Sequence, residues 1–149
     1  MIKVKFVKLE NYPSDVEKVK PTWSYSREGD ACVDIYAAKM TIVDAGETKI
    51  IPTGVKLEIP QGYEMQIRPR SGMSSRGLVA QLGTIDENYR GEIGVILYNN
   101  TSENVIIHRG ERVAQGAIRE VPKVCFELVD ESELSETNRG KEGFGSSGQ

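Results

Sequence analysis

The chain of 149 residues has little of three features that would narrow its class at once: paired cysteines, an excess of one charge and long apolar runs. Its two cysteines, Cys32 and Cys125, lie far apart and lack the spacing of metal ligands. We therefore interpret both as reduced, buried thiols of a cytoplasmic protein, because oxidising compartments favour paired cysteines.

The formal net charge of −3 gives no sign of binding to nucleic acid or membranes, for which a basic surface stripe is the usual requirement. No apolar run approaches the roughly 20 residues that cross a membrane. Residues 1–10 alternate between apolar and charged side chains, unlike a signal peptide. These absences predict a soluble intracellular protein with no stable nucleic-acid or membrane partner.

Glycine and proline, by contrast, are spread along the chain, fifteen and six in number, which favours short strands and turns over long helices. Apolar and polar residues alternate with the period of two that marks a strand with one buried face. Only 13–20 and 72–77 could hold a helical turn. Strands are predicted in segments 2–9, 31–38, 40–60, 63–70, 77–86, 91–99, 104–121 and 123–129.

Short strands separated by turn residues every 8 to 12 residues or so are typical of a sandwich, a barrel or a jelly roll. We predict one all-β domain over residues 1–130. From Asp130 onward the chain is polar and acidic, and then rich in Gly and Ser. Such a segment cannot offset its ordering entropy by burial, so 131–149 is predicted to be a mobile C-terminal arm. Its glycine-flanked Phe144 suggests a segment that orders over a ligand.

Two stretches offer groups that bind phosphate. In RPRSGMSSRG, residues 68–77, arginine supplies a planar fork of donors, and a glycine beside a serine lets backbone N–H groups approach an anion. In RGERVAQGAI, residues 109–118, Arg112 and Gln115 interrupt a strand of small and apolar residues. The plain alternatives are a solvated turn for the first and an edge strand facing water for the second.

A third stretch, GTIDENYRGEIGVILYN at 83–99, places a single carboxylate, Asp86, three residues before Tyr89. A carboxylate can act as general base on a water that faces an electrophile, and a tyrosine ring can pack on a sugar. The alternative is an ordinary hairpin with an acid in its turn. Taken together, the stretches supply phosphate donors, a water base, a sugar platform and a base stack, which are the needs of a nucleoside triphosphate site.

The order of these stretches resembles the five motifs of the trimeric dUTP pyrophosphatases, or dUTPases. The matching segments are ACVDIYAA at 31–38, RPRSG at 68–72, GTIDENYRGEIG at 83–94, RGERVAQ at 109–115 and RGKEGFGSSG at 139–148. Two departures stand out. Ala80 lies where many members carry an asparagine near the uracil, and Glu111 replaces a more common aspartate.

The resemblance implies a jelly-roll or β-clip homotrimer with active sites built between subunits. It also implies hydrolysis of dUTP to dUMP and pyrophosphate, with Mg²⁺ on the triphosphate, which limits uracil in DNA and supplies dUMP for thymidylate synthesis. Two alternatives stay open. One is a dCTP deaminase, or a bifunctional deaminase-dUTPase, of the same fold; the other is a non-catalytic module that senses nucleotide or binds a protein.

Residue roles follow from the same resemblance. Asp86 would activate the attacking water, Asp34 would lie in the outer shell of Mg²⁺ through water, and Tyr89 would pack on the deoxyribose. The implied substrate-binding residues are Arg70, Ser71, Gly72 and Gln115 at the phosphates, Gln81, Gly83, Thr84 and Ile85 at uracil, and Arg139, Phe144, Gly145, Ser146 and Ser147 in the arm.

Overall fold

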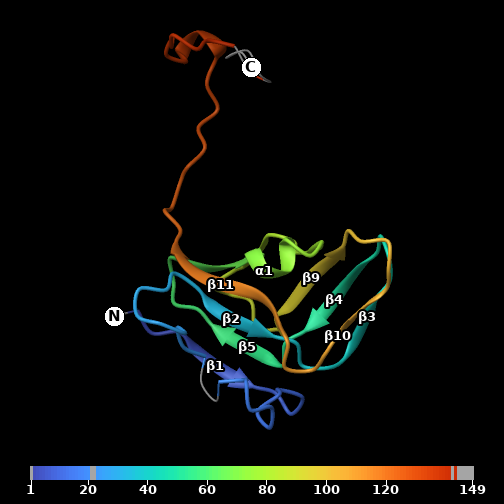
Figure 1. The fold of residues 1–149 in the computed structure, drawn as a ribbon. Helices are drawn as coiled ribbons and strands as arrows, with labels where there is room; N and C mark the ends of the chain where they lie inside the picture. The colour runs from blue at the N-terminus through green and yellow to red at the C-terminus, as the bar shows by residue number, and fades with distance from the viewer. Residues whose placement is uncertain (1, 21–22, 142, 144–149) are drawn as a thin grey trace.

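A body of short strands, from which one long arm departs, makes up the computed structural model, which describes residues 2–20, 23–141 and 143 (Figure 1). The arm leaves the body after the last strand, and the described C-terminal residues lie far from the sheets. The elements are β1 (Lys5–Lys8), β2 (Val33–Tyr36), β3 (Thr41–Val43), β4 (Thr48–Pro52), β5 (Val55–Glu58), β6 (Tyr63–Arg68), α1 (Ser71–Ser74), β7 (Leu78–Ala80), β8 (Gly83–Ile85), β9 (Gly94–Asn99), β10 (Val105–Ile107), β11 (Arg112–Glu120) and the 3-10 turn η1 (Glu131–Glu133).

The strands form four small sheets, and each pair within the described residues is antiparallel. The largest sheet has the order β2-β11-β6-β8, and a second has the order β4-β9-β7. The strands β1 and β5 pair with each other, as do β10 and β3. The prediction of an all-β fold is confirmed. The strand β11, for which an edge position was the plain alternative, is instead central, between β2 and β6.

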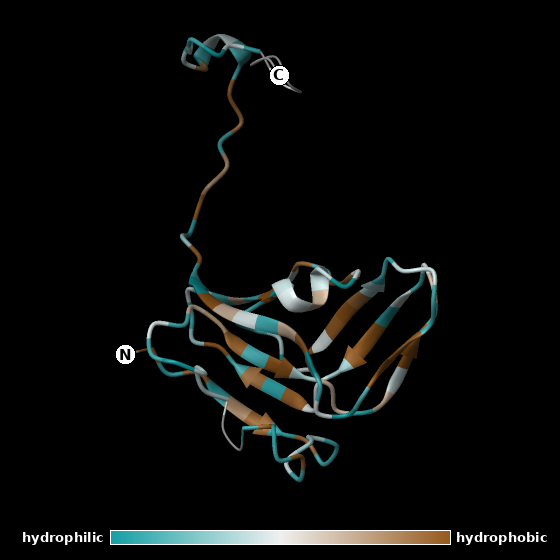
Figure 2. Cartoon of the chain, viewed as in Figure 1, coloured by the Kyte–Doolittle hydropathy of each residue, from teal (hydrophilic) through white to brown (hydrophobic). Residues whose placement is uncertain are grey.

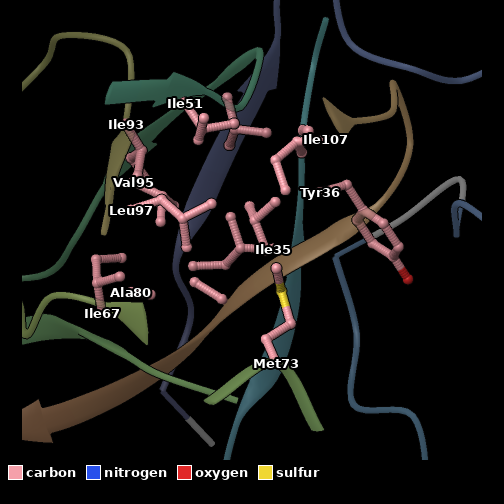
Figure 3. Packing of buried hydrophobic residues seen from close by; sticks show 14 of the residues in the cluster. Ile35, Tyr36, Ile51, Ile67, Met73, Ala80, Ile93, Val95, Leu97 and Ile107 are labelled. Atoms are coloured by element: carbon pink, nitrogen blue, oxygen red, sulfur yellow. The ribbon is translucent and has the colours of Figure 1, made fainter. Parts of the chain in front are cut away.

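The core is aliphatic and lies between the sheets (Figure 3). The predicted alternation is clear on β9, where Val95 and Leu97 are fully buried while Ile96 between them is 44% exposed. Ile35 of β2 and Ile107 of β10 are fully buried as well. Truncating one such side chain to alanine costs about 2–5 kcal/mol, so this packing fixes the strands that carry the site.

The stretch 83–99 is not the hairpin that its sequence predicts. The strand β8 pairs with β6, whereas β9 pairs with β4 and β7. The segment 86–93 therefore crosses from one sheet to another. A loop of this length can span two layers, and its Asp and Gly residues suit a crossing as well as a tight turn. Asp86 thus lies where two sheets meet.

The strand predicted at 123–129 is absent, and these residues extend from the body with Phe126 94% and Leu128 100% exposed (Figures 1 and 2). The strand β11 ends at Glu120, and Pro122 has no N–H with which to continue a ladder. The prediction of buried thiols is also wrong. Both cysteines are free, but Cys32 is only half-buried and Cys125, on the arm, is exposed.

Candidate active site

The first cluster forms around Asp34, on β2. Across the sheet, Asp34 is opposite Gln115 of β11, which in turn is opposite Arg68 of β6. The strand order therefore brings residues from three distant stretches of sequence to one place. Arg70, two residues beyond Arg68, turns back toward Asp34 and donates from Nε to its Oδ1 at 3.1 Å.

Asp34 also holds a second arginine. Arg112 Nη1 donates to Asp34 Oδ2 at 3.3 Å, and Ser26 Oγ donates to the same oxygen at 3.2 Å. The Asp34 side chain is 15% exposed and that of Arg112 is 52% exposed, so the carboxylate is shielded from water while its partner is open to it. Next to it, burial raises the pKa of Tyr36, and the negative charge of Asp34 raises it further, so the phenol keeps its proton. One carboxylate thus organises two guanidinium groups.

The backbone after Arg70 is open to a ligand. Ser71 and Gly72 begin α1 and are exposed, whereas Met73 in the same turn is buried and fixes it to the body. Nothing lies within 4 Å of the point where a Cβ on Gly72 would stand. Gln115 Nε2 donates to the carbonyl of Pro69 at 2.9 Å, which ties the strand β11 to the start of this turn.

A broad hollow of about 860 Å³ opens beside the cluster and is markedly basic. Arg70 and Arg112 line it together with Arg76 and Arg109. Arg76 Nε donates to the carbonyl of Gly72 at 3.1 Å, so its charge lies next to the exposed backbone of α1. The residue roles implied by the resemblance include neither Arg76 nor Arg112. The signal for Arg112 was its interruption of a strand of small and apolar residues.

The second cluster surrounds Asp86, at the end of β8. The side chain is exposed and borders two hollows, of about 380 and 250 Å³. Its backbone is held by a turn in which Tyr89 N–H donates to the Asp86 carbonyl at 3.1 Å. The next residue, Glu87, accepts a short hydrogen bond from the N–H of Gly62, which fastens the loop to the start of β6. The carboxylate is thus presented to solvent on a fixed backbone.

Tyr89 shares the smaller of these hollows with Asp86, Thr84 and Ile85. The strand β8 that carries Thr84 and Ile85 is packed closely on β6, with Gly83 opposite Ile67. Gln81 precedes it as an exposed residue whose N–H donates to the Ile96 carbonyl at 2.8 Å. The predicted uracil and sugar residues are therefore brought together.

The two clusters lie at opposite ends of β6. Ile85, next to Asp86, is opposite Met65 near the start of that strand, whereas Arg70 follows its end. Five residues of extended chain separate Met65 from Arg70, which is about 16 Å at the usual strand rise. Within a single chain, the structure does not bring Asp86 to Asp34 and Arg70.

The arm residues join neither cluster. Arg139 lies in a turn beyond η1, and this part of the chain is remote from the sheets (Figure 1). Phe144, Gly145, Ser146 and Ser147 lie outside the described residues.

The chain's own donors fit a metal that arrives with a ligand rather than one held in a protein cage. Within residues 2–20, 23–141 and 143, no group of three or more His, Cys, Asp or Glu side chains could hold an ion. Mg²⁺ commonly keeps several waters and binds through one or two carboxylates plus phosphate oxygens, and Asp34 beside the basic hollow suits that mode. No helix of the described residues is long and apolar enough to cross a membrane.

Comparisons with known proteins agree with this arrangement. The model of the dUTPase family matches residues 19–148. The chain is 45% identical over 127 residues to the deoxyuridine 5'-triphosphate nucleotidohydrolase of Alkaliphilus metalliredigens, and 46% identical over 132 residues to that of Beijerinckia indica. These alignments cover 83% and 84% of this chain, and 87% and 81% of the two relatives.

Solved structures match as well. A mutant dUTPase of Staphylococcus bacteriophage 80alpha, with dUpNHpp, superimposes with a TM-score of 0.84 at 27% identity, over 99% of both chains. A mutant dUTPase from phage phi11 of S. aureus gives 0.75 at 25% identity, over 89% of this chain and 99% of that one. That second structure is described as revealing the coordination of a structural Mg(II) ion.

Proposed function

The chain belongs to the dUTPase family and hydrolyses dUTP to dUMP and pyrophosphate, and on this basis we propose which of its residues carry out the reaction. The family match over nearly the whole chain is the observation that supports the activity most strongly. The two clusters at the ends of β6 supply the residues. The relatives in both comparisons are described as dUTPases, so neither the deaminase nor the non-catalytic alternative gains support.

The phosphate half of the site is the Asp34 cluster. Arg70, Ser71 and Gly72 bind phosphate oxygens, and Gln115 supports the turn that presents them. Arg112 and Arg76 add positive charge beside it, which matters because the substrate carries about four negative charges and phosphoryl chemistry depends on charge stabilisation. Mg²⁺, when bound, would neutralise part of that charge on the triphosphate, with Asp34 holding its water shell.

The nucleoside half is the Asp86 cluster. Asp86 orients the attacking water and accepts its proton as the oxygen approaches the α-phosphorus. Tyr89 packs on the deoxyribose and leaves no room for a 2′-hydroxyl. The strand residues Gly83, Thr84 and Ile85, with Gln81 before them, surround the uracil edge. Since the loop is fastened to β6 through Glu87 and Gly62, this half is formed before substrate arrives.

The two halves must come from different copies of the chain. Asp86 and Arg70 have to touch one triphosphate, yet a stretch of about 16 Å along β6 separates them in one chain. We therefore propose a homotrimer in which each site combines the Asp86 loop of one copy with the Asp34 cluster of another. Exposed apolar residues suit such assembly: Ile50 is 68% exposed directly opposite Ile96, and Phe126 and Leu128 extend from the arm.

The C-terminal arm completes the site. We propose that Arg139 reaches the terminal phosphate, that Phe144 stacks on uracil, and that Ser146 and Ser147, with the backbone of Gly145, bind phosphate oxygens. Closing such an arm over the substrate excludes water other than the attacking one. The substrate is a DNA precursor, so we assign the reaction to the cytoplasm.

A complementation experiment tests the shared site. Asp86→Asn and Arg70→Ala are each expected to be inactive as homotrimers in a pyrophosphate-release assay with dUTP and Mg²⁺. When the two variants are mixed, partly dissociated and reassembled, some sites receive an intact Asp86 and an intact Arg70 from different chains, and activity returns. Each variant reassembled alone is the control. If the mixture stays as inactive as its components, the shared site is wrong.

The same assay tests substrate choice. dUTP, dCTP, dTTP and UTP are compared with and without Mg²⁺, and only dUTP with Mg²⁺ is expected to turn over rapidly. Ammonia release from dCTP would instead support the deaminase alternative.

A further inference from the structure

The ring of Tyr89 is tied at its hydroxyl end to the backbone of the loop. The hydroxyl donates to the carbonyl of Glu92 at 2.9 Å. Gly91 lies at the same end of the ring, where a Cβ would stand 2.2 Å from the Tyr89 Oη and 2.4 Å from Cζ. Gly91 does not adopt a positive φ, so the backbone at this point does not call for glycine. In this conformation the tyrosine ring occupies the space that a side chain at residue 91 would need, so a substitution there would displace the ring.

The carbonyl that receives Tyr89 belongs to a residue that is itself anchored. Glu92 Oε1 accepts the N–H of Gly54 at 2.8 Å, and Asn11 Nδ2 lies 3.5 Å from the same oxygen. Gly54 is buried in the turn between β4 and β5, with φ of +70°, and a Cβ there would lie 2.8 Å from the Cα of Tyr12. This turn cannot shift without disturbing the body.

The residue after Glu92 strengthens the anchor. Ile93 is fully buried, its N–H donates to the Val55 carbonyl at 2.9 Å, and its carbonyl accepts the hydroxyl of Thr53 at 2.7 Å. Both partners flank Gly54. Residues 92–93 are thus fixed to the β4–β5 turn at three points, two through the backbone of Ile93 and one through the side chain of Glu92, and the Tyr89 hydroxyl bonds to the Glu92 carbonyl.

We infer that Gly91 and Glu92 are positioning residues that set the preference for deoxyribose over ribose by holding the Tyr89 ring rigid; the inference rests on the proposed packing of Tyr89 against the sugar. A side chain can exclude a 2′-hydroxyl sterically only if it cannot move away from it. A ring free to rotate by one rotamer would admit the 2′-oxygen at little cost. The lack of a side chain at Gly91 leaves room for the ring, and the side chain of Glu92 fixes to the core the backbone that accepts the Tyr89 hydroxyl.

A double-mutant cycle tests the contact between Gly91 and Tyr89. The dUTP:UTP ratio of kcat/KM is measured for the wild type, Gly91→Ala, Tyr89→Ala and the double variant. We expect Gly91→Ala to lower the ratio about tenfold, chiefly through a lower KM for UTP. In the Tyr89→Ala background the same alanine should change the ratio less than about twofold, because the ring it displaces is gone.

Each outcome decides a separate point. An unchanged ratio in Tyr89→Ala contradicts the proposed sugar contact itself. A lowered ratio in Tyr89→Ala combined with an unchanged ratio in Gly91→Ala contradicts only the positioning role. A loss caused by Gly91→Ala that is equally large in both backgrounds also overturns it. A general structural defect would lower kcat/KM for dUTP and UTP alike and leave the ratio unchanged, which counts against the inference too.

Glu92 supplies an independent test that does not depend on how Gly91→Ala folds. Glu92→Ala leaves the buried N–H of Gly54 without its acceptor and should lower the ratio about fivefold. Glu92→Gln keeps an oxygen acceptor in the same place and should restore a near wild-type ratio. Glu103→Ala removes an exposed carboxylate elsewhere and is the matched control. Equal ratios in Glu92→Ala and the wild type, or equal losses in the alanine and glutamine variants, overturn the role of Glu92.

Discussion

The loop 86–93 and the segment 121–141, which includes described residues of the C-terminal arm, both follow a strand. The loop is bonded to the body, whereas the segment 121–141 extends away from it. The loop is fastened to two parts of the body, at Gly62 through Glu87 and at Gly54 through Glu92, and the Tyr89 hydroxyl bonds to the Glu92 carbonyl within the loop. The segment 121–141 is exposed throughout. At its start the N–H of Val121 donates to the Gly62 carbonyl at 2.8 Å, and farther along Lys141 pairs with Glu131 of the same segment. On the proposed roles, the part of the site on the loop would be formed by folding, whereas the part on the arm would form only when the arm closes over substrate.

The difference follows from what each segment can bury. The loop carries Ile93, which enters the core, and Gly91, over which the Tyr89 ring comes close. The arm carries apolar residues as well, but in an extended segment after Pro122, where no strand of its own chain lies alongside. A strand without a neighbour has no ladder to stabilise it. The loop therefore has a fixed geometry, whereas the arm can adapt its position.

The substitution with the largest expected effect removes the proposed catalytic carboxylate from the loop. Asp86→Asn keeps the shape of the side chain and the turn formed by the Asp86 carbonyl, but it removes the base. We expect kcat to fall about 10²–10⁴-fold, while the affinity for a non-hydrolysable dUTP analogue, measured by calorimetry, stays close to that of the wild type. A variant that keeps more than a few per cent of the wild-type rate would contradict the role of Asp86 as base.

The next test removes the end of the arm. A chain truncated after Leu134 lacks Arg139 and everything beyond it, and we expect kcat to fall about a hundredfold because the phosphates and uracil lose their cover. The melting temperature and the trimer, measured by calorimetry and light scattering, should not change, since residues 135–141 are exposed. Unchanged kinetics would mean that the arm only solvates the protein.

The smallest effect concerns the segment 11–20, in which Tyr12 and Val19 pack into the core and an exposed ion pair adds a further contact. Arg109 hydrogen-bonds Asp15 and lowers the pKa of that carboxyl. The pair therefore stabilises the fold above the ordinary value of 3.8 and loses its effect as the pH falls through the lower folded pKa. Asp15→Asn should lower the melting temperature slightly at neutral pH, because the pair is exposed.

Melting curves of wild type and Asp15→Asn across pH 7 to pH 2 check this expectation. The difference should shrink toward the acid end. If the difference in melting temperature stayed constant with pH, packing of the segment 11–20, rather than the pair of Asp15 and Arg109, would hold that segment.

Much of the body could be predicted because its signals are local. The alternation at Val95, Ile96 and Leu97 fixes which face of β9 is buried, and the stretch after Arg70 does form a short helix. The pairing of β8 with β6 could not be read in the same way, since it joins residues far apart in sequence and depends on which sheet covers the core. For that reason the crossing at 86–93 was mistaken for a hairpin.

The same distinction applies to the candidate site: its local motifs could be predicted from the sequence, and its long-range contacts could not. Asp34, Arg70 and Asp86 each stand in a recognisable motif, whereas the hold of Asp34 on Arg112 depends on a register shift between β11 and β2 around 112–114. Such a bulge redirects a side chain and leaves little mark in a single sequence. The close approach of Tyr89 to Gly91 could not be predicted from the sequence either, because it depends on the path of the loop in space.

The length of β6 has a consequence for how the enzyme responds to its own concentration. Because that strand keeps Asp86 and Arg70 of one chain apart, the proposed shared site would leave a lone chain unable to catalyse even when it is folded. Activity per chain would then depend on assembly and fall on dilution. A cell that makes little of this protein would hold less than a proportionate share of its activity, and modest increases in expression would raise dUTP hydrolysis steeply.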